Sequence, residues 1–125
     1  MQIHRIYTHS SLRNFTYILV DESEENAYCI DPYDASQVID FLRPRGLKLH
    51  AIINTHEHWD HTRGNAQLVE EYGAKIYVSE GARNKIPGAD FFLQSGDVFS
   101  FPDNIDVRVL ETPGHTAAHI CLLLL

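Results

Sequence analysis

The stretch that decides the fold is AIINTHEHWDH, residues 51–61. It opens on a short apolar run of the kind found in strands that are buried on both faces of a sheet. It then presents three imidazoles and a carboxylate within six residues, from His56, His58, Asp60 and His61. These ligand types suit zinc, iron or manganese better than calcium. Because open α/β sheets place their sites at the carboxyl ends of strands, the stretch predicts a metal site in an α/β protein.

The pattern on either side of this stretch alternates between strands and helices. Residue type and periodicity predict strands over 1–7, 15–20, 27–30, 49–53 and 75–78, and helices over 35–42 and 65–72. Asp34 is a candidate N-cap for the first helix. Past residue 79 the pattern loosens, and we expect hairpin-type strands over 91–101 and 105–110. This order predicts an α/β fold with some parallel pairing.

Composition and charge limit the kinds of binding partner that the chain is expected to have. The 125 residues suit one domain, and 17 acidic against 10 basic residues give a net charge of −7. This charge disfavours nucleic acid, which needs a basic stripe, and an anionic membrane surface. The chain shows no signal-peptide pattern and no apolar window of about 18 residues, as a membrane span requires. We therefore expect a cytoplasmic protein.

The two cysteines lie in apolar, strand-like contexts. Cys29 lies between Tyr28 and Ile30, and Cys121 between Ile120 and Leu122. Free cysteine is among the most buried residue types, so we expect two small buried side chains. Nothing in the pattern requires a disulfide.

Spacing divides the candidate ligands into two groups. Residues two apart in an extended segment point the same way, so His56 and His58 can converge on one metal. His115 follows a Pro-Gly turn and would complete three nitrogens, leaving the open fourth position of a catalytic site. Asp60 and His61 come where the backbone enters a helix, so they should point elsewhere and suit a second metal.

Two other interpretations of the same residues carry less weight. A zincin helix would need His-Glu-x-x-His, but position 60 is Asp. A polar loop with exposed histidines and a helix-capping Asp60 would not explain so dense a cluster. Asp31 ends a strand before Pro32, and we favour a role for it in supporting a ligand or a turn over direct ligation.

The run Thr55–His61 resembles the H-x-H-x-D-H signature of the metallo-β-lactamase superfamily. Asp31-Pro32 and the loop Thr112–Thr116 match that family's order and spacing as well, so the resemblance covers nearly the whole chain. Trp59 and the residues from Thr112 to His119 resemble the glyoxalase II branch, although Ala118 stands where that branch usually has glycine.

This resemblance implies an α/β fold, the αββα sandwich of two similar halves with a two-metal site between them. It implies that His56, His58 and His115 hold the first metal and that Asp60 and His61 hold the second, with Asp60 as the candidate catalytic carboxylate. Zinc, as one or two ions, is the implied cofactor, with iron or manganese as alternatives. A metal-bound hydroxide would attack a carbonyl carbon, as in glyoxalase II, which hydrolyses glutathione thioesters.

The match fails after residues 120–125, where the family continues with a bridging aspartate and a last histidine. We therefore expect residues 1–125 to form a metallo-β-lactamase-like domain truncated at its C-terminal side, an incomplete sandwich that carries the first metal-binding motifs. The isolated chain should be a weak or inactive hydrolase of small-molecule thioesters. It should form a homodimer through its exposed C-terminal strand. A single-iron persulfide dioxygenase and a non-catalytic metal-binding remnant are the alternatives.

Overall fold

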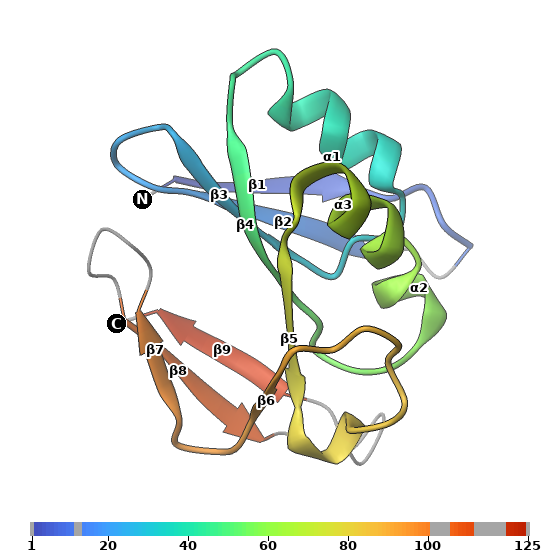
Figure 1. Cartoon of the computed structure of the whole chain (residues 1–125), viewed down its shortest axis with the longest axis vertical. Helices are drawn as coiled ribbons and strands as arrows, with labels where there is room; N and C mark the ends of the chain where they lie inside the picture. Colours follow the sequence, from blue (N-terminus) through green and yellow to red (C-terminus); the bar gives the residue numbers. More distant parts are fainter. Residues whose placement is uncertain (1, 12–13, 101–105, 112–119, 125) are drawn as a thin grey trace.

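The computed structural model describes residues 2–11, 14–100, 106–111 and 120–124. These residues form two sheets that pack face to face, with helices on the outer face of the larger sheet (Figure 1). The strands are β1 (Gln2–Tyr7), β2 (Phe15–Val20), β3 (Asn26–Ile30), β4 (Lys48–Ile53), β5 (Lys75–Ser79), β6 (Phe91–Leu93), β7 (Val98–Ser100), β8 (Asp106–Glu111) and β9 (Ile120–Leu124). The helices are α1 (Ala35–Leu42), α2 (Trp59–Thr62), α3 (Asn65–Tyr72) and the 3₁₀ turn η1 (Glu80–Ala82).

The larger sheet has the strand order β1-β2-β3-β4-β5-β6. β1, β2 and β3 pair antiparallel, whereas β3, β4, β5 and β6 pair parallel. Ile30 lies opposite Ile53 in the β3–β4 register, so the two strands end side by side. The residues that follow them, Asp31 and Asn54, therefore meet at one edge of the sheet.

One face of this sheet is covered by α1 and α3. α1 spans the predicted residues, and the Asp34 carboxylate accepts a hydrogen bond from the Ser36 amide at 2.9 Å, which confirms the predicted N-cap. Its buried residues Val38, Ile39 and Leu42 pack against the strands in a cluster that includes Cys29. α1 and α3 each have eight residues. No helix within the described ranges is long and apolar enough to cross a membrane.

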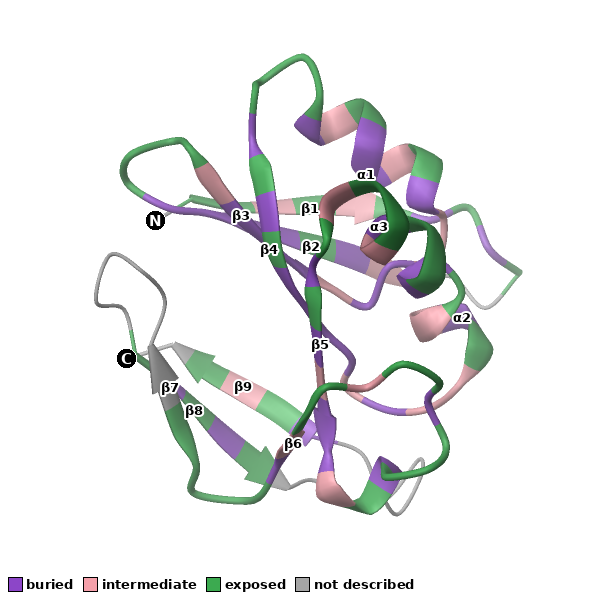
Figure 2. Cartoon of the chain, in the orientation of Figure 1, coloured by how far each residue is buried: buried purple, intermediate pink, exposed green. Residues whose placement is uncertain are grey.

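The other face of the larger sheet packs against the three-stranded antiparallel sheet β7-β8-β9. Leu19, Ala51 and Ile53 of the larger sheet form a buried cluster with Val107 of β8. Buried residues, drawn in purple, recur along β2, β4 and β8 (Figure 2). The arrangement is one helix layer followed by two sheets. It confirms the predicted incomplete αββα sandwich.

Two sequence predictions need correction. Residues 91–101 were expected to form one hairpin-type strand, but β6 pairs parallel with β5, and β7 pairs with β8 in the other sheet. The chain changes sheets at a turn where Gly96 has φ +89 and the Asp97 carboxylate accepts from the Gln94 amide. Both cysteines were expected to be buried. Cys29 is buried, but Cys121 is exposed because it lies on the outward face of β9.

Candidate metal centre

The histidines of the run converge at the carboxyl end of β4. His56 is buried, and its ring centroid lies 4.9 Å from that of His58 and 4.0 Å from that of His61. His56 and His58 therefore converge as their spacing predicts. The expectation that His61 points away from His56 is wrong, because the chain turns into α2 at Trp59 and brings His61 back over His56.

Asp31 supports this cluster from the end of β3. Its Oδ2 accepts a hydrogen bond from His61 Nδ1 at 2.8 Å and from the Thr55 hydroxyl at 2.6 Å. Its Oδ1 accepts from the Thr55 amide at 2.7 Å. Asp31 thus orients a neighbouring histidine, as a support for a metal ligand does. It also lies close enough to join a site, because one ligand atom each from Asp31, His56 and His61 all lie within 4.8 Å of one another.

The hydrogen-bond network assigns the protons on the imidazoles of His56 and His61. The Thr55 hydroxyl donates to Asp31, so it accepts from His56 Nδ1, which is 3.0 Å away. His61 donates from Nδ1 to Asp31. In both neutral rings the lone pair therefore belongs to Nε2, the nitrogen that a metal would use.

Asp60 is buried beside His61 at the first turn of α2. Its Oδ2 accepts a hydrogen bond from Asn14 Nδ2 at 3.1 Å and lies 3.2 Å from His61 Nε2. Its Oδ1 is buried and has no hydrogen-bond partner among the described residues. A buried carboxylate oxygen without a partner is costly, so this atom points to a bound cation or water.

The charges of the cluster fit a cation between Asp60 and His61. In its neutral form, His61 Nε2 presents a lone pair to the Asp60 carboxylate, so a positive charge beside the pair, from a proton or a metal ion, would be favourable. Burial by itself lowers the pKa of His61, but the hydrogen bond and charge of Asp31 and the charge of Asp60 outweigh it and raise that pKa. The residues present therefore fit a metal ion.

His115 lies outside the described residues, so its proposed ligation of the first metal stays a prediction. The strand that follows its loop does reach the centre. The Ile120 amide at the start of β9 donates to the Thr55 carbonyl at 2.8 Å. Trp59, between His58 and Asp60 in the sequence, is 55% exposed and lies beside Tyr33, with ring centroids 5.6 Å apart.

Sequence reasoning missed three groups that hold the centre in place. Asn14 contacts Asp60, and Thr55 links Asp31 to His56. Asn54 donates to the His61 carbonyl at 3.0 Å and is paired with Asn65. Thr55 and Asn54 lie beside the ligand run, which is the only signal that could have found them. Asn14 carries no such signal.

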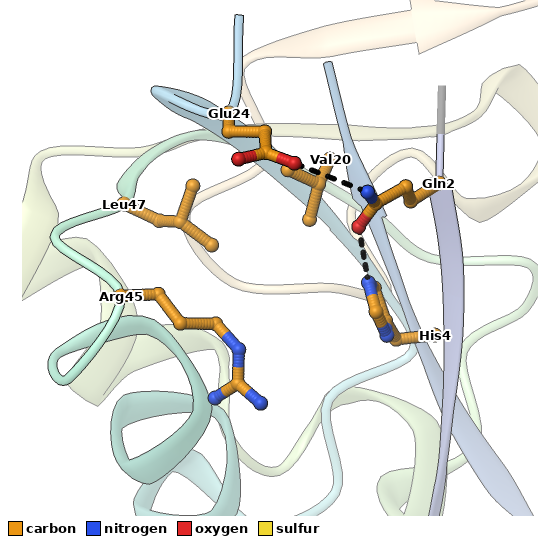
Figure 3. Close-up of a pocket in the computed structure, with 6 residues that line it drawn as sticks. All are labelled: Gln2, His4, Val20, Glu24, Arg45 and Leu47. Atoms are coloured by element: carbon orange, nitrogen blue, oxygen red, sulfur yellow. Dashed lines mark hydrogen bonds between the residues drawn. The ribbon is translucent and has the colours of Figure 1, made fainter. Parts of the chain in front are cut away.

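A separate cavity lies at the opposite end of β4 (Figure 3). Its volume is about 330 Å³. On its wall, Gln2 Oε1 accepts a hydrogen bond from His4 Nε2, and Gln2 Nε2 donates to Glu24. The other lining residues are Val20, Arg45 and Leu47. The cavity lies beyond the amino end of β4, whereas the candidate ligands follow its carboxyl end. It is therefore distinct from the metal centre.

Comparisons with known proteins agree with this fold and site. A family model described as the metallo-beta-lactamase superfamily matches residues 14–124. A hydroxyacylglutathione hydrolase from Polaromonas sp. is 38% identical over 98% of this chain and 46% of that protein. One from Gloeobacter violaceus is 41% identical over 96% of this chain and 47% of that protein.

A solved structure shows the same likeness. ETHE1 from Myxococcus xanthus is 30% identical, with a TM-score of 0.83 over 99% of this chain and 54% of that one. The chain spans about half the length of the curated relatives it matches. The family model covers most of this chain, and the centre lies where the motif residues meet. The chain belongs to the metallo-β-lactamase superfamily.

Proposed function

We propose that this chain carries the metal-binding motifs of a glyoxalase II-like hydrolase, which cleaves small-molecule thioesters. The observation that carries the proposal is the cluster of buried His56 and Asp60 with half-buried His61, with an unpartnered Asp60 Oδ1 among the described residues. The likeness to hydroxyacylglutathione hydrolases over nearly the whole chain supports the thioester and suggests glutathione as its thiol carrier.

His56, His58, Asp60 and His61 would hold the metal, with His115 as a further proposed ligand. We propose zinc, because imidazole and carboxylate ligands suit it, with iron or manganese as alternatives. When bound, the metal would polarise the thioester carbonyl and lower the pKa of a water to about 7.

The chain's own residues would orient these ligands. Asp31 holds His61 through Nδ1, and Thr55 holds His56 through Nδ1, so each ring keeps Nε2 directed to the cluster. Asp60 keeps Oδ1 available to bind the metal or to accept a hydrogen bond from a water. Rings and a carboxylate held in this way need little rearrangement on binding, which favours the reaction.

The proposal is tested by removing two histidines in turn, His56 in the loop after β4 and His50 on β4 itself. The zinc-loaded 125-residue chain is assayed on a hydroxyacyl thioester of glutathione, beside its His56→Ala and His50→Ala variants. His50 is exposed and bonds to Asn26 instead of the cluster, so its loss should leave activity unchanged. We expect weak turnover, because the chain spans about half of its relatives, and we expect His56→Ala to abolish it.

Turnover that is unchanged in the His56→Ala variant would contradict the proposed site. One iron per chain together with oxygen consumption would favour a persulfide dioxygenase-like function instead. Metal binding without either activity would favour a non-catalytic metal-binding role.

A further inference from the structure

We propose that Asn14 is a positioning residue for Asp60, holding the carboxylate so that Oδ1 faces the metal centre. The proposal rests on the metal centre proposed above. Asn14 lies in the segment between β1 and β2, and 46 residues separate it from Asp60. Among the described residues, Asp60 is the one member of the cluster to which Asn14 forms a hydrogen bond.

Asn14 contacts Asp60 at two points. Its Nδ2 donates to the Asp60 main-chain carbonyl at 2.7 Å and to the Asp60 carboxylate Oδ2 at 3.1 Å. The first bond holds the Asp60 backbone at the start of α2. The second holds the Asp60 carboxylate in one orientation about its Cβ–Cγ bond. Because Oδ2 is occupied in this way, Oδ1 is the oxygen left for a ligand.

The two oxygens of Asp60 that Asn14 contacts determine which way its amide faces. The Thr8 and Ser10 hydroxyls lie 2.5 Å and 2.7 Å from Asn14 Oδ1. The Asp60 carbonyl and carboxylate oxygens can only accept, so the reverse orientation would place Oδ1 against two acceptors. The hydroxyls can donate as well as accept, and here they donate to Oδ1. The amide therefore has one satisfied orientation, and in it both Nδ2 contacts go to Asp60.

Asp60 needs such a support because its local structure provides little. α2 has only four residues and no side-chain hydrogen bond at its N-cap. His61 Nε2, 3.2 Å from Oδ2, is itself a candidate ligand and cannot serve as a fixed donor once a metal binds. Without Asn14 the Asp60 carboxylate could rotate, and its two oxygens would compete for the position that faces the metal. Loss of such an outer support typically lowers metal affinity by about 10- to 100-fold.

A double-mutant cycle on zinc affinity tests the proposal. Zinc binding is measured by competition with a chelator for the unsubstituted chain, Asn14→Ala, Asp60→Asn and the double variant. We expect Asn14→Ala to weaken binding about 10- to 100-fold. We expect no further loss from Asn14→Ala once Asp60 is substituted, because Asn14 acts through Asp60.

Gln37→Ala is the matched control. The Gln37 amide also donates to a main-chain carbonyl, that of Tyr7, but touches none of the candidate ligands. Its removal should leave zinc affinity unchanged. Unchanged affinity in Asn14→Ala, or losses that simply add in the double variant, would overturn the proposal. Additive losses would show that Asn14 acts on the fold as a whole.

A metal-free measurement separates this proposal from that of the metal centre. In the ¹⁵N-labelled chain without zinc, the side-chain amide protons of Asn14 should exchange slowly with solvent. Asp60→Ala should shift their signals and speed their exchange. Absence of zinc binding in the unsubstituted chain would contradict the proposed metal centre. Rapid exchange of the Asn14 amide protons, or Asn14 signals that do not change in Asp60→Ala, would overturn the role of Asn14 whether or not zinc binds.

Discussion

At the scale of single residues, His61 is the group whose charge decides how the centre responds to pH. It lies between the carboxylates of Asp31 and Asp60, and they raise its pKa above 6.5 in spite of burial. In the metal-free chain, the charged imidazole stabilises the fold fully below about pH 6.5, and this contribution is lost as pH rises through the raised pKa. A zinc ion bound through His61, as we propose, would displace that proton, so zinc affinity should rise with pH through the same window.

Asp31→Asn should therefore lower the pKa of His61, reduce the proton released on zinc binding near neutral pH, and weaken binding about 10- to 100-fold. Calorimetric titration in two buffers of different ionisation enthalpy measures the released proton. Equal proton release by the two proteins would show that Asp31 does not set the charge of His61.

At the scale of elements, the turn between β2 and β3 depends on one carboxylate. Asp21 is buried, and it accepts hydrogen bonds from the Ser23 hydroxyl, the Asn26 side chain and the main-chain amides of Glu25 and Asn26. Burial alone would raise the pKa of Asp21, but these bonds outweigh it and lower the pKa below 3.8. The stabilisation is therefore present above about pH 3.8 and is lost as pH falls through the lowered folded value.

Asp21→Ala should reduce the free energy of unfolding by about 1–3 kcal/mol at pH 7, and by less in strong acid. Denaturant unfolding at both pH values provides the measurement. Asp40→Ala removes the same charge from an exposed position on α1 and should have little effect. Equal losses in the two variants would mean that the turn does not depend on the bonds to Asp21.

At the scale of the whole molecule, the smaller sheet has one face against the core and one exposed. Val107 and Val109 face inward and are fully buried, whereas Val98, Leu110 and Leu123 are 40–49% exposed. β9 is also an edge of this sheet within the described residues. Exposed apolar side chains beside an unpaired edge strand favour association, so we propose a homodimer through β9.

Leu123→Lys should shift this dimer toward monomer, because it places a charge on the exposed face without disturbing the core. Light scattering over a range of concentrations measures the change. A monodisperse monomer of the unsubstituted chain at high concentration would contradict the expected association.

The sequence by itself determined the features that depend on short-range chemistry. The bounds of α1 and its Asp34 cap follow from helical periodicity and a local hydrogen bond, and both agree with the structure. The ligand run follows β4 because an apolar strand ends where polar residues begin. The motif residues also predict the superfamily, which the family model confirms.

The tertiary structure alone decided how distant segments meet. Asp31 contacts His61 across 30 residues, and Asn14 contacts Asp60 across 46. The placement of β6 and β7 in different sheets likewise depends on pairing with other segments of the chain. No local pattern encodes these contacts, because they depend on the register of β2, β3 and β4 and on the packing that places the ends of these strands together. Periodicity and capping act over a few residues, whereas the support of the metal centre is a property of the assembled sheet.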